Sequence, residues 1–222
     1  MVPLSGSVAV MILHVDVISD VICPWCYIGK RRLEKAVANL DRQHEVRVRW
    51  LPFQLNPTIP KEGISRSEFR TRNFGSWERS LELDAKVVAV GKEEGIHFAF
   101  DRMERTPNTL DAHRLIWLAD KEGIQDAVVE ALFRGYFTEG RDISNRQALI
   151  DVVAEAGLDR NGAEATLNSN DGLEAIKEAE EMSRRHRVDG VPFFIINGEI
   201  TLGGAQPPEA FLEAFGQAEA LK

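Results

Sequence analysis

Two residues with redox-capable side chains, Cys23 and Cys26, are the only cysteines among the 222 residues, and Pro24 and Trp25 stand between them. A cysteine thiolate is the nucleophile in disulfide exchange, and a second thiol nearby can resolve the mixed disulfide. The alternatives are half of a zinc site or two buried thiols. Structural zinc usually takes four Cys or His ligands, and the five histidines are scattered singly. We therefore interpret the pair as a redox motif without a metal.

The pair stands where a predicted strand gives way to a predicted helix. Residues 11–18 are aliphatic and β-branched and predict a buried strand, and hydrophobic residues between 28 and 40 recur at helical spacing. Pro24 suits the first position of that helix. Unpaired N–H groups and the helix dipole stabilise a thiolate there, lowering a thiol pKa from about 8.5 to roughly 3.5–7.5. We assign Cys23 as the nucleophile and Cys26, one turn further along, as the resolving cysteine.

Composition excludes some classes of partner. The chain is 44% hydrophobic and 28% charged, with a formal net charge of −8. This charge argues against a nucleic-acid surface and against binding to anionic membranes. Two short basic runs, at 30–32 and 184–187, fall within helical patterns and are expected on solvated helix faces. Lys30 and Arg31 could still raise the electrostatic potential near the thiols.

The sequence also bears on location in the cell. No segment reaches the ~18–20 apolar residues of a membrane span. Residues 1–10 have no basic stretch, and their apolar run continues into the predicted strand, so we expect a tail rather than a signal peptide. We therefore expect a cytoplasmic protein, where a close cysteine pair is more typical of catalysis than of structure.

The remaining elements predict the fold. A second strand at 45–53 completes a βαβ unit with a parallel pair. Residues 62–169 carry only helical patterns, including one opened by a capping box at Ser144 and Gln147, and they form an insert too long for a loop. A helix, two strands joined by Asn197-Gly198 and a last helix follow; Asn-Gly favours a type I′ hairpin.

The order β-α-β, insert, α-β-β-α predicts an α/β protein with a thioredoxin-like fold and an inserted all-helical domain. We expect three parts: an N-terminal tail at 1–10, a discontinuous thioredoxin-like domain at 11–61 and 170–222, and a helical insertion domain at 62–169.

Several motifs resemble one known family. They are the stretches 20–30, 55–57, 108–115, 190–194 and 203–206, which read DVICPWCYIGK, LNP, NTLDAHRL, GVPFF and GGAQ. Together they resemble the DsbA-like thioredoxin-fold oxidoreductases, and most closely the FrnE-type branch related to 2-hydroxychromene-2-carboxylate isomerases.

The resemblance implies a substrate-binding loop. It implies that the Val191–Pro192 peptide bond is cis and faces the cysteines, and that the backbone of Val191 pairs with a bound peptide or glutathione as an added strand would. Pro24 and Trp25 join them as candidate substrate-binding residues. The alternative for Pro192 is a loop residue ahead of an edge strand, which the nearby cysteine pair disfavours.

The chain departs from the thioredoxin pattern at one position. Many relatives place a buried acid six residues before the first cysteine, where this chain has Val17. Asp16 and Asp20 flank it, and either could substitute or could serve a solvated or capping role. In the matching motif near residue 110, Asn108 is as consistent with a helix N-cap, and His113 with a packed helix residue. The Pro-Trp dipeptide leaves the reduction potential open between about −120 and −270 mV.

Three functions follow. The first is a thiol–disulfide oxidoreductase acting on protein or small-molecule thiols and disulfides, with no resident cofactor and with glutathione as a candidate co-substrate. The second is a glutathione-dependent isomerase or transferase of an aromatic or polyketide-like small molecule. The third is a chaperone-like binder that does not need Cys23. The second cysteine favours the first function, and a homodimer is compatible with all three.

Overall fold

The computed structural model describes residues 10–41 and 43–221, so the predicted tail lies outside the described residues except for Val10. A four-stranded sheet has the order β2-β1-β5-β6. Its strands are β1 (Met11–Ser19), β2 (His44–Pro52), β5 (Phe193–Ile196) and β6 (Ile200–Gly203). Strands β1 and β2 are parallel, whereas β5 is antiparallel to both β1 and β6. The predicted α/β thioredoxin-like order is confirmed.

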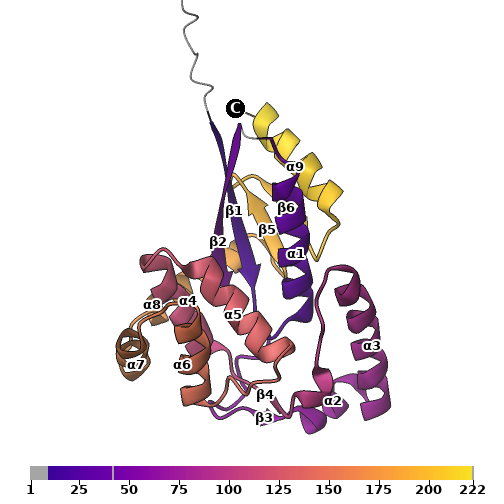
Figure 1. Cartoon of the computed structure of the whole chain (residues 1–222), viewed down its shortest axis with the longest axis vertical. Coiled ribbons are helices and arrows are strands. Elements are labelled where there is room, and N and C mark those ends of the chain that lie inside the picture. Colours follow the sequence, from indigo (N-terminus) through magenta and orange to yellow (C-terminus); the bar gives the residue numbers. More distant parts are fainter. Residues whose placement is uncertain (1–9, 42, 222) are drawn as a thin grey trace, which may run out of the picture.

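The hairpin between β5 and β6 turns at the predicted dipeptide. Asn197 has φ of 50° and Gly198 has φ of 79°, which fits the two left-handed positions of a type I′ turn. Helices α1 (Pro24–Ala38) and α9 (Pro208–Ala220) lie side by side along the sheet (Figure 1). Between them and the strands, Leu13, Val17 and Phe194 are fully buried.

The insert lies at the end of the sheet where β1 ends and α1 begins (Figure 1). Its helices are α2 (Arg66–Phe74), α3 (Trp77–Glu93), a short 3₁₀ turn (Phe100–Arg102), α4 (Leu110–Lys121), α5 (Gln125–Phe137), α6 (Arg146–Glu155) and α7 (Arg160–Asn168). The insert is not entirely helical, contrary to the prediction: β3 (Ile64–Ser65) pairs antiparallel with β4 (Arg105–Thr106). Two-residue strands are too short to show an alternating pattern in the sequence.

Helix α6 begins one residue later than predicted. Its N-cap is Asn145, whose side-chain oxygen accepts a hydrogen bond from the backbone N–H of Ala148 at 3.0 Å. The hydroxyl of Ser144 instead donates to Asp142. Asn and Ser are equally good N-cap residues, so intrinsic preference does not distinguish Asn145 from Ser144. The contact of Ser144 with Asp142 leaves Asn145 as the N-cap of α6. Helix α8 (Leu173–Arg185) follows the insert and packs on β2 and α4.

One side chain of the insert completes the edge of the sheet. The Gln125 side chain accepts a hydrogen bond from Trp50 N at 2.8 Å and donates one to Trp50 O at 3.0 Å. A neighbouring strand would use the same two backbone groups. The first residue of α5 therefore fixes the insert to β2.

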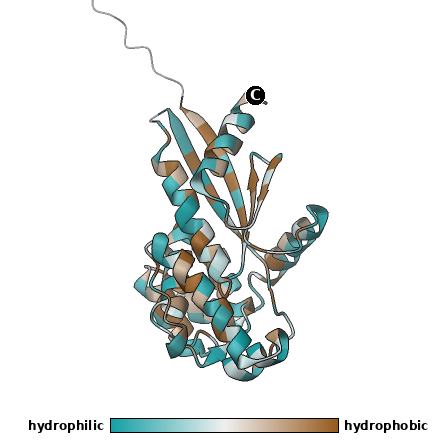
Figure 2. Cartoon of the chain, turned by 90° about the vertical axis from the view of Figure 1, so that its right-hand side faces the viewer, coloured by the Kyte–Doolittle hydropathy of each residue, from teal (hydrophilic) through white to brown (hydrophobic). Residues whose placement is uncertain are grey.

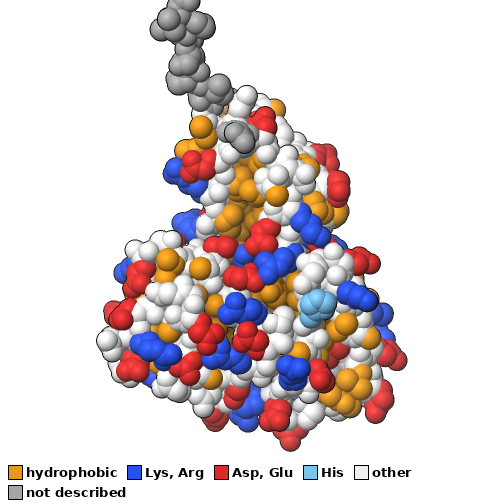
Figure 3. Space-filling model, in the orientation of Figure 1, with side chains coloured by type: hydrophobic (Ala, Val, Ile, Leu, Met, Phe, Trp, Pro, Cys, Tyr) orange, Lys and Arg blue, Asp and Glu red, His pale blue; other side chains and the backbone are white. Residues whose placement is uncertain are grey.

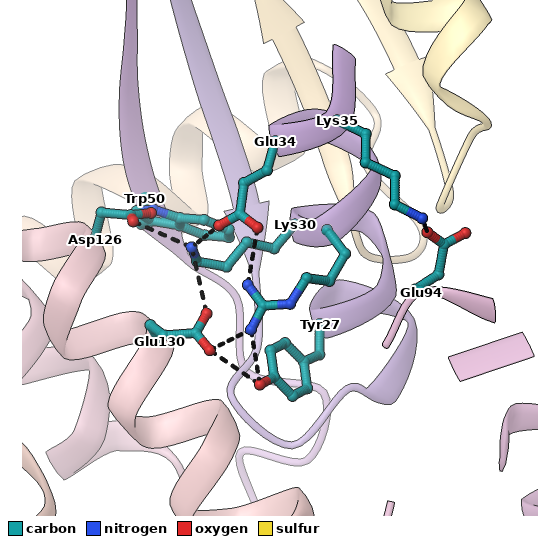
Figure 4. Close-up of polar contacts among 9 residues, drawn as sticks. Tyr27, Lys30, Glu34, Lys35, Trp50, Glu94, Asp126 and Glu130 are labelled. Carbon is teal, nitrogen blue, oxygen red and sulfur yellow. Dashed lines mark hydrogen bonds and ion pairs between the residues drawn. The ribbon is translucent and has the colours of Figure 1, made fainter. Parts of the chain in front are cut away.

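A second link between sheet and insert is ionic. The ammonium group of Lys30 on α1 contacts Glu34, lies 3.1 Å from Asp126 and lies 3.4 Å from Glu130 (Figure 4). Burial lowers the pKa of Lys30, but the three carboxylates outweigh it and the pKa is raised. The expected solvated face is therefore wrong for Lys30, because α5 covers this side of α1. The run at 184–187 is exposed, as expected.

Hydrophobic and hydrophilic residues alternate along the helices and strands (Figure 2), and acidic and basic side chains are interspersed over the face in Figure 3. Within the described part of the chain, no helix is both long enough and apolar enough to cross a membrane.

Candidate active site

Cys23 is the N-cap residue of α1, as the sequence predicts, and Pro24 is the first helical residue. The backbone of Cys23 is extended, with φ of −92° and ψ of 110°, so the Cys23 sulfur stands at the N-terminal end of the helix. The side chain is 5% exposed, and its thiol donates to the carbonyl oxygen of Val191 at 3.4 Å. The helix N-terminus and the loop before β5, which are 168 residues apart, therefore meet at this sulfur.

Cys26 is fully buried one turn into α1, and both cysteines are unlinked thiols in this structure. Burial raises the pKa of the Cys26 thiol well above its usual value, and the adjacent Cys23 sulfur adds to the rise, whereas Ser19 and the backbone of Asp20 oppose it. The two sulfurs thus differ in access. Cys23 lines a cavity that Cys26 does not reach.

The Val191–Pro192 peptide bond is cis, as the resemblance implies. Pro192 is buried, and its carbonyl oxygen accepts a hydrogen bond from Gly204 N at 2.8 Å. The structure brings Pro24, Trp25, Val191 and Pro192 around the cysteines, although their roles in binding remain predictions.

Gly29 on α1 is a further residue of the site, which was not among the residues predicted from the sequence. A Cβ atom at this position would lie 3.0 Å from Pro192 Cγ and 3.1 Å from Phe194 Cζ. Glycine within a helix costs about 1 kcal/mol relative to alanine, so its presence calls for a reason. The reason here is that α1 must approach the cis-proline loop closely. The glycine inside a predicted helix was the signal that could have found it.

Of the two acids that flank Val17, only Asp20 belongs to the site. Asp16 pairs with Arg49 on β2 at 2.7 Å, away from the cysteines. Asp20 is fully buried, its backbone carbonyl accepts from Cys23 N at 3.0 Å, and its Oδ2 accepts from Leu55 N at 2.8 Å. Asp20 therefore fixes the loop that leads into α1.

The motif near residue 110 supports the same loops. His113 is buried, as expected of a packed helix residue, and lies beside Asp20. Asn108 is not the N-cap of α4; that residue is Thr109. The Asn108 side chain instead accepts from Leu110 N and donates to the carbonyl oxygen of Ile59 at 2.7 Å, because the 57–59 loop passes beside the start of α4.

A cavity of about 380 Å³ opens beside Cys23. The redox motif forms one side of it, and α2, α3 and α5 of the insert form the others. Most of its lining is apolar, and Trp25 and Phe74, 40% and 41% exposed, also line it. The described residues contain no group of three or more His, Cys, Asp or Glu side chains placed to hold a metal ion.

The chain is similar to known proteins in both sequence and structure. A sequence model of the DSBA-like thioredoxin domain matches residues 14–216. The structure of a probable DsbA oxidoreductase from Streptomyces coelicolor is 30% identical, with a TM-score of 0.87 over 95% of this chain and 91% of the other.

Two more distant structures share the fold. A 2-hydroxychromene-2-carboxylate isomerase is 21% identical, with a TM-score of 0.69 over 96% of this chain and all of the other. The cytosolic disulfide reductase DsbM from Pseudomonas aeruginosa, solved with GSH, is 22% identical, with a TM-score of 0.63 over 93% of this chain and all of the other. These neighbours are consistent with the FrnE-type branch.

Proposed function

The chain belongs to the family of DSBA-like thioredoxin domains, and we propose that it is a thiol–disulfide oxidoreductase with Cys23 as nucleophile and Cys26 as resolving cysteine. The observation that carries this proposal is the asymmetry of the pair. Cys23 is the N-cap residue of α1 and lines a cavity, whereas Cys26 is fully buried one turn deeper.

The reaction follows from this asymmetry. The Cys23 thiolate attacks one sulfur of a substrate disulfide, and the first substrate thiolate leaves as a mixed disulfide forms. Cys26 loses its proton and attacks the Cys23 sulfur, which releases the second substrate thiolate and leaves the Cys23–Cys26 disulfide. The substrate gains two electrons and the protein loses them. The reverse sequence oxidises a substrate dithiol.

The carbonyl oxygen of Val191 borders the point of attack. A backbone carbonyl next to a reacting sulfur can accept an N–H donor from a bound peptide, as in strand addition. Glutathione is a candidate partner on the same grounds, and the fold neighbour DsbM was solved with GSH. We place the reaction in the cytoplasm, because the fold neighbour DsbM is described as cytosolic.

The test is a pair of variants with the reduction potential. Cys23→Ser is expected to abolish disulfide exchange, and Cys26→Ser to accumulate mixed disulfides with substrate that mass spectrometry detects. Equilibration in glutathione buffers gives the potential of the pair. If no intramolecular disulfide forms at any glutathione ratio, the proposal is wrong.

The glutathione-dependent isomerase is the second candidate, and the cavity beside Cys23 favours it. Its volume is in the range of small-ligand sites, and one thiol at the helix start suffices to orient glutathione. Under this function Cys26→Ser preserves turnover, whereas under the first function it stops turnover at the mixed disulfide.

A further inference from the structure

The cavity beside Cys23 has the opposite charge to the whole chain. The formal net charge of the protein is −8. The charged side chains that line the cavity are Arg66, Arg70, Lys86 and Asp84, three cations and one carboxylate. A low-dielectric wall of one sign concentrates ligands of the opposite sign.

The arrangement of Arg66, Asp84 and Arg70 leaves one positive charge unbalanced. Asp84 Oδ2 accepts from Arg66 Nη2 at 2.6 Å, and Asp84 Oδ1 accepts from Arg70 Nη2 at 2.6 Å. Both carboxylate oxygens are therefore engaged, each by a different guanidinium.

Arg66 and Asp84 have little access to water, and the side chain of Arg70 is 18% exposed. The side chain of Arg66 is 4% exposed and that of Asp84 is 9% exposed. Burial and the nearby Arg66 lower the pKa of Arg70, and Asp84 offsets them only in part. An incompletely paired charge in such surroundings is costly, so an anion in the cavity would complete the group.

Most of the remaining lining is apolar, and several of its residues are aromatic. It includes Phe69, Phe100 and Phe137 together with Met103 and Val87. A cavity of about 380 Å³ enclosed by the insert suits a small molecule rather than an extended chain.

We infer that the substrate at Cys23 is a small thiol or disulfide with an aromatic or similarly apolar body and an anionic group that binds Arg66 and Arg70. This inference rests on the proposed function and names the substrate class of the same site. The apolar body lies in the cavity, and the reacting sulfur lies at Cys23. The chemistry is the two-step exchange above, with two thiolates released per reduced protein.

The test compares two aromatic disulfides that differ in charge. Reduced protein is mixed with 5,5′-dithiobis(2-nitrobenzoate), which carries a carboxylate on each ring, or with uncharged 4,4′-dithiodipyridine. Stopped-flow absorbance follows thiol release as a function of disulfide concentration. Because the two reagents differ in intrinsic reactivity, the half-saturation concentrations are compared rather than the rates. We expect the half-saturation concentration of the anionic disulfide to be lower than that of the uncharged disulfide by a factor of about ten.

The matched variants assign the preference to the cavity. Arg66→Gln and Arg70→Gln are each expected to reduce the anionic preference about tenfold. Arg72→Gln removes the same charge from the same helix at an exposed position outside the cavity, and it should retain the preference. Equal saturation by both disulfides, or a preference that survives both cavity variants, overturns the inference.

A binding measurement covers the case in which Arg66→Gln does not fold. The Cys23→Ser/Cys26→Ser protein keeps the cavity residues Arg66 and Arg70 as well as Arg72. Calorimetry compares the binding of 1-naphthoate and 1-naphthylmethanol to this protein. Tighter binding of the acid supports the inference, and equal binding overturns it. An acidic peptide disulfide that saturates below the aryl disulfide also overturns it, in favour of a protein substrate. Release of two thiolates per chain when the reduced wild-type protein reacts with the disulfides shows that the redox function itself stands, whatever the binding comparisons give.

Discussion

The Oδ1 atom of Asp20 lies 3.4 Å from the Nε2 atom of His113, and both side chains are buried where the sheet meets the insert. The distance is that of an ion pair, but the two atoms are not aligned as a hydrogen bond, and neither has another hydrogen-bond partner among the described residues. The other carboxylate oxygen of Asp20 accepts from Leu55 N. This carboxylate therefore joins the loop before α1 to the segment that follows β2 and to α4 of the insert.

We expect Asp20→Ala to lower the free energy of unfolding by about 1–3 kcal/mol, because the Leu55 N–H loses its acceptor, the carboxylate of the fully buried Asp20. Asp16→Ala is the matched control: its partner Arg49 is about half exposed, so the loss should be about 0–1 kcal/mol. Urea unfolding of the two reduced variants makes the comparison. Equal losses would show that the buried contacts of Asp20 add nothing to stability.

Gly29→Ala tests the close approach of α1 to Pro192. The added Cβ would meet Pro192 and Phe194 at 3.0 and 3.1 Å, so the loop that carries Val191 must move. We expect slower attack by Cys23 on a disulfide, measured by stopped flow under identical conditions.

Gly216→Ala is the control for that variant. Gly216 lies within α9 and has no atom within 4 Å of an added Cβ. It should gain about 0.5–1 kcal/mol of stability from helix propensity, with unchanged kinetics. If both variants react at the wild-type rate, the contact between Gly29 and Pro192 does not position the loop.

The pKa of Cys26 predicts a pH dependence of the resolving step. Burial and the neighbouring Cys23 raise this pKa, so the Cys26 thiol stays protonated at neutral pH. The rate at which the second thiolate is released should therefore keep rising with pH. The rise should continue above the pH at which an exposed thiol is already ionised. Stopped-flow traces from pH 6 to 10 resolve this second phase, and a phase that levels off below the usual thiol range would contradict the prediction.

The same shift predicts how stability depends on pH. A pKa raised in the folded state means that the unfolded chain loses the Cys26 proton first as pH rises. The stability of the reduced protein is thus retained below the usual thiol pKa and falls as pH rises toward the higher folded value. Cys26→Ser should lose less stability between pH 7 and pH 10 in urea unfolding. Parallel pH curves for the two proteins would show that Cys26 does not contribute.

Lys30→Met tests the ionic link between α1 and α5. Three carboxylates lose their shared cation, and we expect a loss of about 1–3 kcal/mol, below that of a fully buried pair because these carboxylates reach solvent. Lys177→Met removes an exposed pair with Glu174 and should cost at most about 0.5 kcal/mol. Urea unfolding measures both, and a Lys30→Met variant as stable as Lys177→Met would refute the link.

The fold was predictable because its signals are local. The aliphatic run at 11–18, Pro24 at a helix start and the Asn197-Gly198 turn each specify an element without reference to distant residues. The cysteine pair was predictable for the same reason. The strands β3 and β4 could not be predicted, because two residues are too few to show an alternating hydrophobic pattern.

The rest of the site depends on contacts far apart in the sequence. Lys30 reads as a surface lysine until α5 brings Asp126 and Glu130 to it across about 100 residues. Asp16 and Asp20 read alike, and only the placement of Leu55 and His113 distinguishes them. The cationic lining of the cavity likewise comes from two helices that the sequence does not place beside Cys23.

The side-chain amide of Gln125 bonds the two backbone groups of Trp50 that a neighbouring strand would use. This contact affects whether another chain can extend the sheet. β2 is an edge strand, and an edge with free N–H and C=O groups invites another chain to extend the sheet. At Trp50 both groups are already taken by Gln125. Extension at this end of β2 would require α5 to move away, so the insert blocks strand addition at Trp50 while it also walls the cavity beside Cys23.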